Sequence, residues 1–200
     1  SAGDTILGTG GLYRQGNILI NKPLFLKGID YPILDGENKY ELISVKSPFV
    51  TVEGFQIQNS GHSSMVDVAG IKIYNTHHVK IISNILKDNF FGIYSQQAQR
   101  CVIQNNTITA SSMETHLSGN GIHCWKSDSI FISHNNVTGH RDGIYLEFVT
   151  HSQVEENKVQ NNNRYGLHFM FAHNNSYTNN IFRNNGAGVA VMYTRNVIMN

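Results

Sequence analysis

A five-residue phrase that begins with glycine recurs along this sequence at a nearly fixed interval. It runs from Gly143 to Glu147 and returns 23 and then 22 residues later, each time with apolar side chains at alternate positions. The same phrase also begins at three earlier glycines. The six glycines that open it are Gly70, Gly92, Gly121, Gly143, Gly166 and Gly188. A period of this length predicts an array of structural repeats.

An asparagine repeats with the same period, fourteen residues after the glycine in five successive units. These residues are Asn84, Asn106, Asn135, Asn157 and Asn180. The interval between Gly92 and Gly121 is 29 residues, which fits the period if about seven residues are inserted around Ser111 to Leu117. We expect this insertion to bulge from one corner and to leave the repeat in phase.

Each unit contains three short β-prone pieces, and no run of ten residues has helical apolar spacing. In the unit that begins at Gly143 these pieces are Ile144 to Leu146, the surroundings of Val154, and the surroundings of Val159. Three short strands per coil of 22 or 23 residues predict a right-handed parallel β-helix of the pectin-lyase-like kind, with coils about 4.8 Å apart. We expect the repeated asparagine to adopt left-handed angles at a corner and to form a hydrogen-bonded Asn ladder.

The whole chain, 1–200, is expected to form a single β-helix domain, with opening coils at 1–59 and regular repeats at 60–200. Strands are predicted in the opening part, with turns at Pro23, Gly28 and Gly36. These strands cover 12–13, 18–20, 24–26 and 33–36, and the alternation resumes at 50–57. Because the sequence stops at Asn200 within a coil, we expect the natural chain to continue or a partner to cap the exposed strand edges.

Composition excludes some classes of partner. Charged residues make up 14% of the chain, the net charge is +1, and no basic cluster occurs, which argues against nucleic acid as a partner. No apolar run is long enough to predict a transmembrane segment. The two cysteines, Cys101 and Cys124, fall on different strands of the predicted coils, so a disulfide between them is not expected.

The first strand of each unit has an unusual outward face. Counting from the glycine, positions one and three are mostly apolar and should face the core, so positions two and four should face outward. Position two forms a first column of Lys72, Tyr94, His123, Tyr145, His168 and Ala190. Position four forms a second column of Tyr74, Gln96, Trp125, Glu147, Met170 and Met192. A face that met only water would instead hold Thr, Ser, Lys and Glu.

One interpretation of the two columns is a metal site. Met170 and Met192 lie in one file with Glu147, and His168 is two residues from Met170. Imidazole nitrogen and thioether sulfur together suit copper(I), whereas zinc sites seldom use methionine. His123 is two coils from His168, roughly 9.6 Å at the strand spacing, so the two cannot share one ion unless Tyr145 moves or a partner supplies the other ligands.

Two other interpretations stay open at this point. Methionine and aromatic residues are also typical of a protein-docking scaffold. A polysaccharide lyase, hydrolase or uronate epimerase is a further possibility for a β-helix, but these enzymes need clustered carboxylates and basic residues. Glu147 is the lone carboxylate predicted on the face, and Asp142 with Arg141 should be held at the turn. The sequence therefore argues against an enzyme.

Four successive phrases together resemble the signature of the NosD family, the β-helix proteins of nitrous oxide reductase maturation. The phrases are 119–125, 141–147, 164–171 and 187–193, and the resemblance runs in order from about Tyr13 to Asn200. Cys124 stands where an aliphatic residue is expected. The resemblance implies a periplasmic, copper-handling protein that is not an enzyme. It also implies that the protein acts together with the membrane and ATPase subunits of an ABC transporter and with a copper-carrying lipoprotein. Together they would build the copper-sulfur centre of nitrous oxide reductase.

The resemblance and the two columns lead to specific expectations about residues. The expected copper(I) ligands are His168, Met170 and Met192, followed by Glu147 and His123. Glu147 is expected to orient His168 or to bind copper directly. The expected partner face consists of Trp125, Tyr145, Arg164, Phe171 and Tyr193. His116 and His140 are expected to lie near this face.

Overall fold

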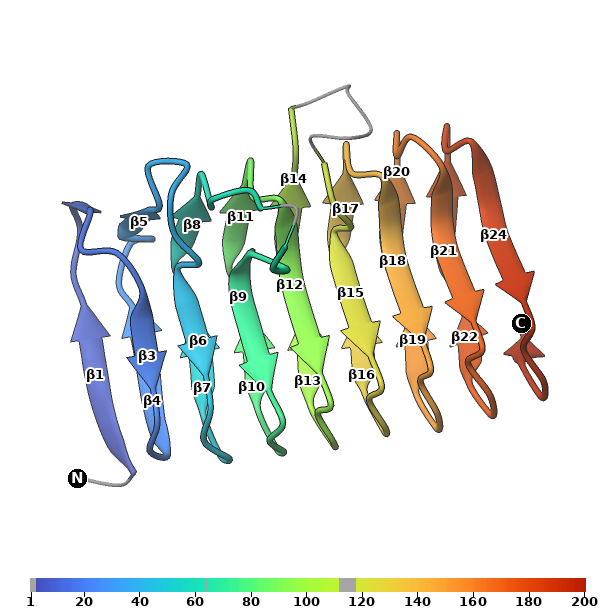
Figure 1. The fold of residues 1–200 in the computed structure, drawn as a ribbon, viewed down its shortest axis with the longest axis horizontal. Coiled ribbons are helices and arrows are strands. Elements are labelled where there is room, and N and C mark those ends of the chain that lie inside the picture. The colour runs from blue at the N-terminus through green and yellow to red at the C-terminus, as the bar shows by residue number, and fades with distance from the viewer. Residues whose placement is uncertain (1–2, 64, 112–117) are drawn as a thin grey trace.

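The chain winds into a right-handed parallel β-helix of about eight coils, as the repeat period predicts. This computed structural model describes residues 3–63, 65–111 and 118–200. Figure 1 shows the coils stacked along one axis, with the N-terminus at one end of the stack and the C-terminus at the other. No helix in the described residues is both long enough and apolar enough to cross a membrane.

Three parallel sheets form the sides of the coil. The first sheet, among the described residues, contains β1 (Asp4–Gly8), β4 (Leu24–Gly28), β7 (Thr51–Glu53), β10 (Lys80–Ile82), β13 (Val102–Gln104), β16 (Phe131–Ser133), β19 (Gln153–Glu155), β22 (Ser176–Thr178) and β25 (Ile198–Met199). The second contains β2 (Leu12–Tyr13), β5 (Ile33–Asp35), β8 (Gln56–Gln58), β11 (Ile85–Lys87), β14 (Thr107–Thr109), β17 (Asn136–Thr138), β20 (Lys158–Gln160) and β23 (Ile181–Arg183).

The third sheet carries the glycine phrases. It contains β3 (Ile18–Ile20), β6 (Ile43–Val45), β9 (Ala69–Tyr74), β12 (Phe91–Gln96), β15 (Ile122–Trp125), β18 (Asp142–Glu147), β21 (Tyr165–Met170) and β24 (Ala187–Met192). The predicted opening strands all exist and join these sheets. Strands β1 and β6 were not predicted from the sequence.

The core is built from columns of aliphatic side chains in register. Ile122, Ile144 and Leu167 are successive partners on the third sheet, and all three are fully buried. Burying one such side chain contributes roughly 1.5–3 kcal/mol, so the columns account for much of the favourable free energy of folding. In the last coil the core side of the sheet is open, because Val191 is 42% exposed whereas its partner Phe169 is fully buried.

Close packing between coils requires glycine at four of the phrase openings, Gly92, Gly121, Gly143 and Gly166, whereas a Cβ at Gly188 would meet no atom closer than 3.7 Å. A Cβ added at Gly143 would lie 2.1 Å from a methyl carbon of Val159 and 2.8 Å from the carbonyl oxygen of Gly166. Neither contact is possible without moving the backbone of the coil. The recurring glycine is therefore explained by packing.

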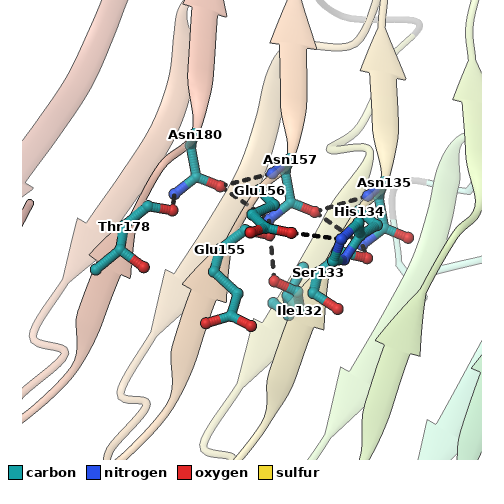
Figure 2. Close-up of polar contacts among 9 residues, drawn as sticks. All are labelled: Ile132, Ser133, His134, Asn135, Glu155, Glu156, Asn157, Thr178 and Asn180. Carbon is teal, nitrogen blue, oxygen red and sulfur yellow. Dashed lines mark hydrogen bonds and ion pairs between the residues drawn. The ribbon is translucent and has the colours of Figure 1, made fainter.

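The predicted Asn ladder is present and buried. The Asn135 side chain donates to Asn157 at 2.9 Å, and that of Asn157 donates to Asn180 at 3.0 Å, as Figure 2 shows. Each Oδ1 also accepts the backbone N–H of the asparagine in the preceding coil, for example Asn106 to Asn135 at 3.0 Å. The amide groups therefore satisfy main-chain polar groups at a buried corner.

The prediction that the ladder asparagines adopt left-handed angles is wrong. The residue before each of them has the positive φ, as His134 (56°) and Glu156 (54°) illustrate. The ladder residue itself must point its amide inward, so the turn is made one position earlier. Ser, Asn, His and Glu all occur at this left-handed position, so no single residue type marks it in the sequence.

The predicted insertion falls largely on residues 112–117, which lie outside the described residues. The coils on either side stay in phase, because Asn106 donates to Asn135 across it at 3.0 Å. Both cysteines are free and buried, and Cys124 faces the core, as predicted.

Candidate functional site

The outward side of the third sheet, called the face below, has the two predicted columns. His123, Tyr145 and His168 are successive partners in the first column. Glu147, Met170 and Met192 are successive partners in the second. Parallel in-register pairing therefore brings together side chains that are 22 or 23 residues apart in the sequence.

The first column is buried, although it points away from the core. Its rings pack against one another, two pairs tilted and the last stacked: the centroid distances are 4.6 Å from Tyr94 to His123, 4.8 Å from His123 to Tyr145 and 4.5 Å from Tyr145 to His168. At the other end of this stack, the Lys72 ammonium lies 4.7 Å from the Tyr94 ring centroid. We call this set the ring stack. The sequence located the column but could not show that neighbouring rings shield one another from water.

His168 is held by Asp142. Its Nδ1 lies 3.2 Å from an Asp142 carboxylate oxygen, and Arg164 binds the same carboxylate through Nε at 2.8 Å and through one terminal nitrogen. Burial would raise the pKa of Asp142, but the hydrogen bonds from Arg164 and His168 outweigh it and lower the pKa to about 2. The expectation that Glu147 orients His168 is thus corrected, because Asp142 has that role.

This arrangement leaves one His168 nitrogen available. When Nδ1–H donates to the carboxylate, Nε2 carries the lone pair. His168 is only 3% exposed, and its Nε2 is buried without a hydrogen-bond partner. Met170 and Met192, in the adjoining column, are half-buried. A carboxylate-oriented imidazole with a free Nε2 is the form in which histidine binds metal ions.

A separate pocket of about 380 Å³ lies further along the face. Its walls are Asp67, Tyr94, Gln96, His123, Trp125 and Glu147. His123 Nε2 is 3.6 Å from a Glu147 oxygen, beyond hydrogen-bond length. Burial lowers the pKa of His123 despite the opposing effect of Glu147, so the imidazole is neutral at neutral pH.

The pocket corrects the expectation that Glu147 is the lone carboxylate of the face. Asp67 reaches the same pocket from the loop before β9, and its carboxylate contributes to the raised pKa of Tyr94, although burial is the larger cause. Asp67 lies before the glycine phrase and outside the repeat, so the periodicity gave no signal for it. The argument against an enzyme from a missing carboxylate pair therefore fails.

The face offers no preformed site for a hard metal ion. Within residues 3–63, 65–111 and 118–200, no three His, Cys, Asp or Glu side chains are grouped so that they could hold a metal ion. Methionine thioethers are not among those four side-chain types. Imidazole and thioether ligands in general favour soft ions over zinc and calcium.

The predicted partner face is divided between buried and exposed residues. Phe171 and Tyr193 are 37% and 73% exposed, and they stack with Phe148 along one corner at centroid distances of 5.1 and 5.0 Å. We call these three residues the aromatic corner. Tyr145, by contrast, is buried in the ring stack, and Arg164 is engaged by Asp142.

Of the two histidines expected near the face, the structure describes His140, which does not contribute to it. His140 is fully buried at another corner, where its main-chain N–H donates to Asn162 at 3.0 Å. His116 lies outside the described residues. His140 occupies a rung of a second ladder, which continues from Asn162 to Asn185 with a 2.9 Å side-chain hydrogen bond.

The sequence is similar to a protein described as a probable ABC transporter binding protein NosD from Pseudomonas aeruginosa. The two are 31% identical over 130 residues, which is 64% of this chain and 30% of the relative. The chain therefore spans less than a third of the length of that relative. The similarity agrees with the resemblance inferred from the four phrases.

Solved structures with similar coordinates are β-helix proteins. A DFA-IIIase from Arthrobacter chlorophenolicus matches with a TM-score of 0.56 and 17% identity over 88% of this chain and 42% of that one. The periplasmic alginate epimerase AlgG matches with a TM-score of 0.53 and 12% identity over 98% and 77% of the two chains. At these identities the likeness shows the fold alone.

The family model described as the right handed beta helix region matches residues 41–200, which is most of the chain. The match begins just before β6 and continues through the last strand of the structure. The repeat period, the three parallel sheets and this match agree: the chain belongs to the right-handed beta helix family.

Proposed function

We propose that this chain belongs to a periplasmic, non-enzymatic accessory protein that handles copper(I) for assembly of the copper-sulfur centre of nitrous oxide reductase. Its partners would be the membrane and ATPase subunits of an ABC transporter, a copper-carrying lipoprotein and the reductase. Support comes from the similarity to a relative described as an ABC transporter binding protein, and from the donor set of the face.

The observation that carries the proposal is the state of His168. Asp142 fixes the imidazole so that Nε2 has a free lone pair, and Nε2 is buried without a protein partner. A buried polar atom without a partner costs roughly 1–3 kcal/mol, and a bound ion would remove this cost. In this proposal copper is an ion that the protein passes on, and not its own cofactor.

Met170 and Met192 would supply the sulfur. They are in register on β21 and β24, and Met170 is on the same strand and the same side as His168. Thioether and imidazole ligands select copper(I) over harder ions. Glu147 and His123, also expected as ligands, face each other in the adjoining pocket, so they would serve a second ion and would not complete this site.

The aromatic corner is the proposed contact surface for a partner. Phe148 and Phe171 have φ values of 53° and 50°, a conformation that bulky side chains rarely adopt. Three exposed rings in that conformation are better explained by binding than by folding, since Asn or Gly would suit the backbone there. Trp125 and the exposed part of Arg164 would extend the same surface.

A copper(I) titration against a competing chelator, without oxygen, tests the proposal. We expect a site of about one ion per chain that His168→Ala or Met170→Ala weakens by at least tenfold, about 1.4 kcal/mol. Asp142→Asn should weaken it by about 10–100-fold, because it disturbs the tautomer and orientation of His168. His151→Ala, which removes an exposed corner imidazole, is the matched control.

If the parent chain does not compete with the chelator, or if His151→Ala weakens binding as much as His168→Ala, copper is not held on this face. The docking-scaffold interpretation would then stand. Circular dichroism of each variant should be unchanged, so that loss of binding is not confused with loss of the coil.

A carbohydrate-active β-helix remains the second candidate, since Asp67 and Glu147 line one pocket with Trp125. No lysine or arginine lines that pocket among the described residues, so it could not neutralise the carboxylate of a uronate. This favours the copper-handling proposal. Incubation with alginate or pectin oligomers should accordingly give no new reducing ends, unsaturated products or epimers.

A further inference from the structure

Arg164 reaches the proposed copper(I) site through another side chain. Its guanidinium binds both oxygens of the Asp142 carboxylate, with Nε 2.8 Å from Oδ1 and one terminal nitrogen 2.5 Å from Oδ2. The same Oδ2 lies 3.2 Å from His168 Nδ1. Asp142 opens β18, and Arg164 comes just before β21 in the next coil. The three groups therefore form a row that runs from the surface to the buried imidazole.

The Asp142 carboxylate has few other constraints. It is fully buried, and its one further hydrogen bond among the described residues comes from the main-chain N–H of Tyr165 at 3.3 Å. The last torsion of an aspartate side chain is broad, so packing alone does not fix the plane of the carboxylate. Two parallel bonds from a planar guanidinium fix both its position and its plane. Arg164 therefore determines which oxygen faces His168.

Packing fixes the plane of the His168 ring but not the places of its nitrogens. Tyr145 stacks on the ring at a centroid distance of 4.5 Å with the planes 24° apart, and Tyr165 contacts it edge-on at 4.9 Å. A half-turn of the imidazole about its Cβ–Cγ bond keeps this plane and exchanges each nitrogen with a carbon. The hydrogen bond to Asp142 selects one of the two orientations, which the neighbouring rings cannot do.

Arg164 itself is held at the surface. Its guanidinium carbon lies 5.0 Å from the Tyr165 ring centroid, and its side chain is 44% exposed. An ion pair between exposed groups contributes little, but here the partner is buried and the contact is bidentate. A simple crosslink between coils would stabilise the fold without affecting His168. The two roles therefore differ in what a substitution of Arg164 changes.

We propose that Arg164 is a positioning residue for the copper(I) site. By fixing the Asp142 carboxylate, it sets the ring orientation and the Nδ1–H tautomer of His168, so that Nε2 stays a free acceptor. Arg164 touches no ion in this role. The inference rests on the proposed copper(I) function only for its effect on binding, because the state of His168 can be measured without copper.

Nitrogen-15 NMR of the metal-free protein, labelled at histidine, tests the positioning. At about pH 8 an ordinary imidazole is neutral, and a nitrogen that carries hydrogen is distinct in chemical shift from one with a lone pair. His168→Asn identifies the signals of His168. We expect Nδ1–H with a lone pair on Nε2 in the parent chain, and a mixture of forms in Arg164→Gln.

Two further variants separate positioning from charge and from general effects of removing arginine. Arg164→Lys keeps the positive charge but cannot form two parallel bonds, so we expect the spectrum of Arg164→Gln. Arg183→Gln, which removes an exposed arginine on β23, should give the parent spectrum. If Arg164→Gln does not fold, Arg164→Lys carries the test. A parent spectrum in Arg164→Lys, or in Arg164→Gln with or without lower stability, would overturn the proposal.

The chelator titration then measures the effect on binding. Arg164→Gln and Arg164→Lys should each weaken copper(I) about tenfold, the lower end of the range for groups that orient a ligand, and Arg183→Gln should not. If the parent chain binds no copper but the His168 spectrum changes as expected, the copper proposal fails and the positioning role stands. If the parent binds copper and both Arg164 variants bind it as tightly, the positioning role fails and the copper proposal stands.

Discussion

The Asn ladder and the ring stack are both columns of side chains repeated from coil to coil, yet they differ in how completely their polar atoms are used. In the ladder, the amides of Asn106, Asn135 and Asn157 bond to the next rung and to main-chain carbonyl groups. In the ring stack, tyrosine and histidine alternate from Tyr94 to His168, and His123 and His168 each have an unpartnered Nε2. The uniform ladder maintains the coil, whereas the unpartnered Nε2 of His168 is the atom on which the proposed copper(I) site rests.

The comparison predicts that a ladder residue matters most for stability. Asn135→Ala should lower the free energy of unfolding by about 3 kcal/mol or more, because it removes several buried hydrogen bonds and strands the N–H of Asn106. Asn163→Ala, at an exposed position of the next repeat, should change it by no more than about 0.5 kcal/mol. Urea unfolding measures both. Equal effects in the two variants would show that the ladder is not the stabilising element.

His140 sharpens the comparison, because it puts an imidazole on a rung of the second ladder. Burial lowers its pKa from 6.5 to about 4, so below pH 6.5 the unfolded chain binds a proton that the folded chain does not. Stability should therefore fall as pH falls from 6.5 towards 4, by about 2.5 kcal/mol between pH 7 and pH 4.5. His140→Asn should remove this component. Urea unfolding midpoints of the parent and the variant at the two pH values measure this component. If both proteins lose the same stability at low pH, the acid sensitivity comes from other groups.

The aromatic corner should show the smallest effect. Phe171→Gly removes stacking with Phe148 and Tyr193, worth about 0.5–1.5 kcal/mol per ring pair, but relieves a positive φ that costs phenylalanine about 1–2 kcal/mol. The net change in unfolding free energy should be within about 1 kcal/mol, as thermal denaturation can measure. A loss above about 3 kcal/mol would mean that the corner belongs with the ladder as a structural element.

Several features of the site could not be predicted from the repeat pattern, and the reason is known for each. Asp142 was placed at a turn because it precedes the glycine phrase, but its carboxylate turns onto the face and binds Arg164 and His168. Asp67 was missed because it belongs to a loop outside the periodic part. Glu147 was assigned to the wrong histidine, since the spacing gives the rung of a residue but not the direction of its side chain.

The sequence by itself determined the fold, the coil period, the Asn ladder and the membership of the two columns. In a parallel β-helix every coil pairs in register with the next, so residues one period apart must be neighbours. The tertiary structure alone decided which of these neighbours are buried and which partner each polar atom has. Those contacts depend on side-chain rotamers and on how the loops approach the coil, and neither of these produces a periodic pattern in the sequence.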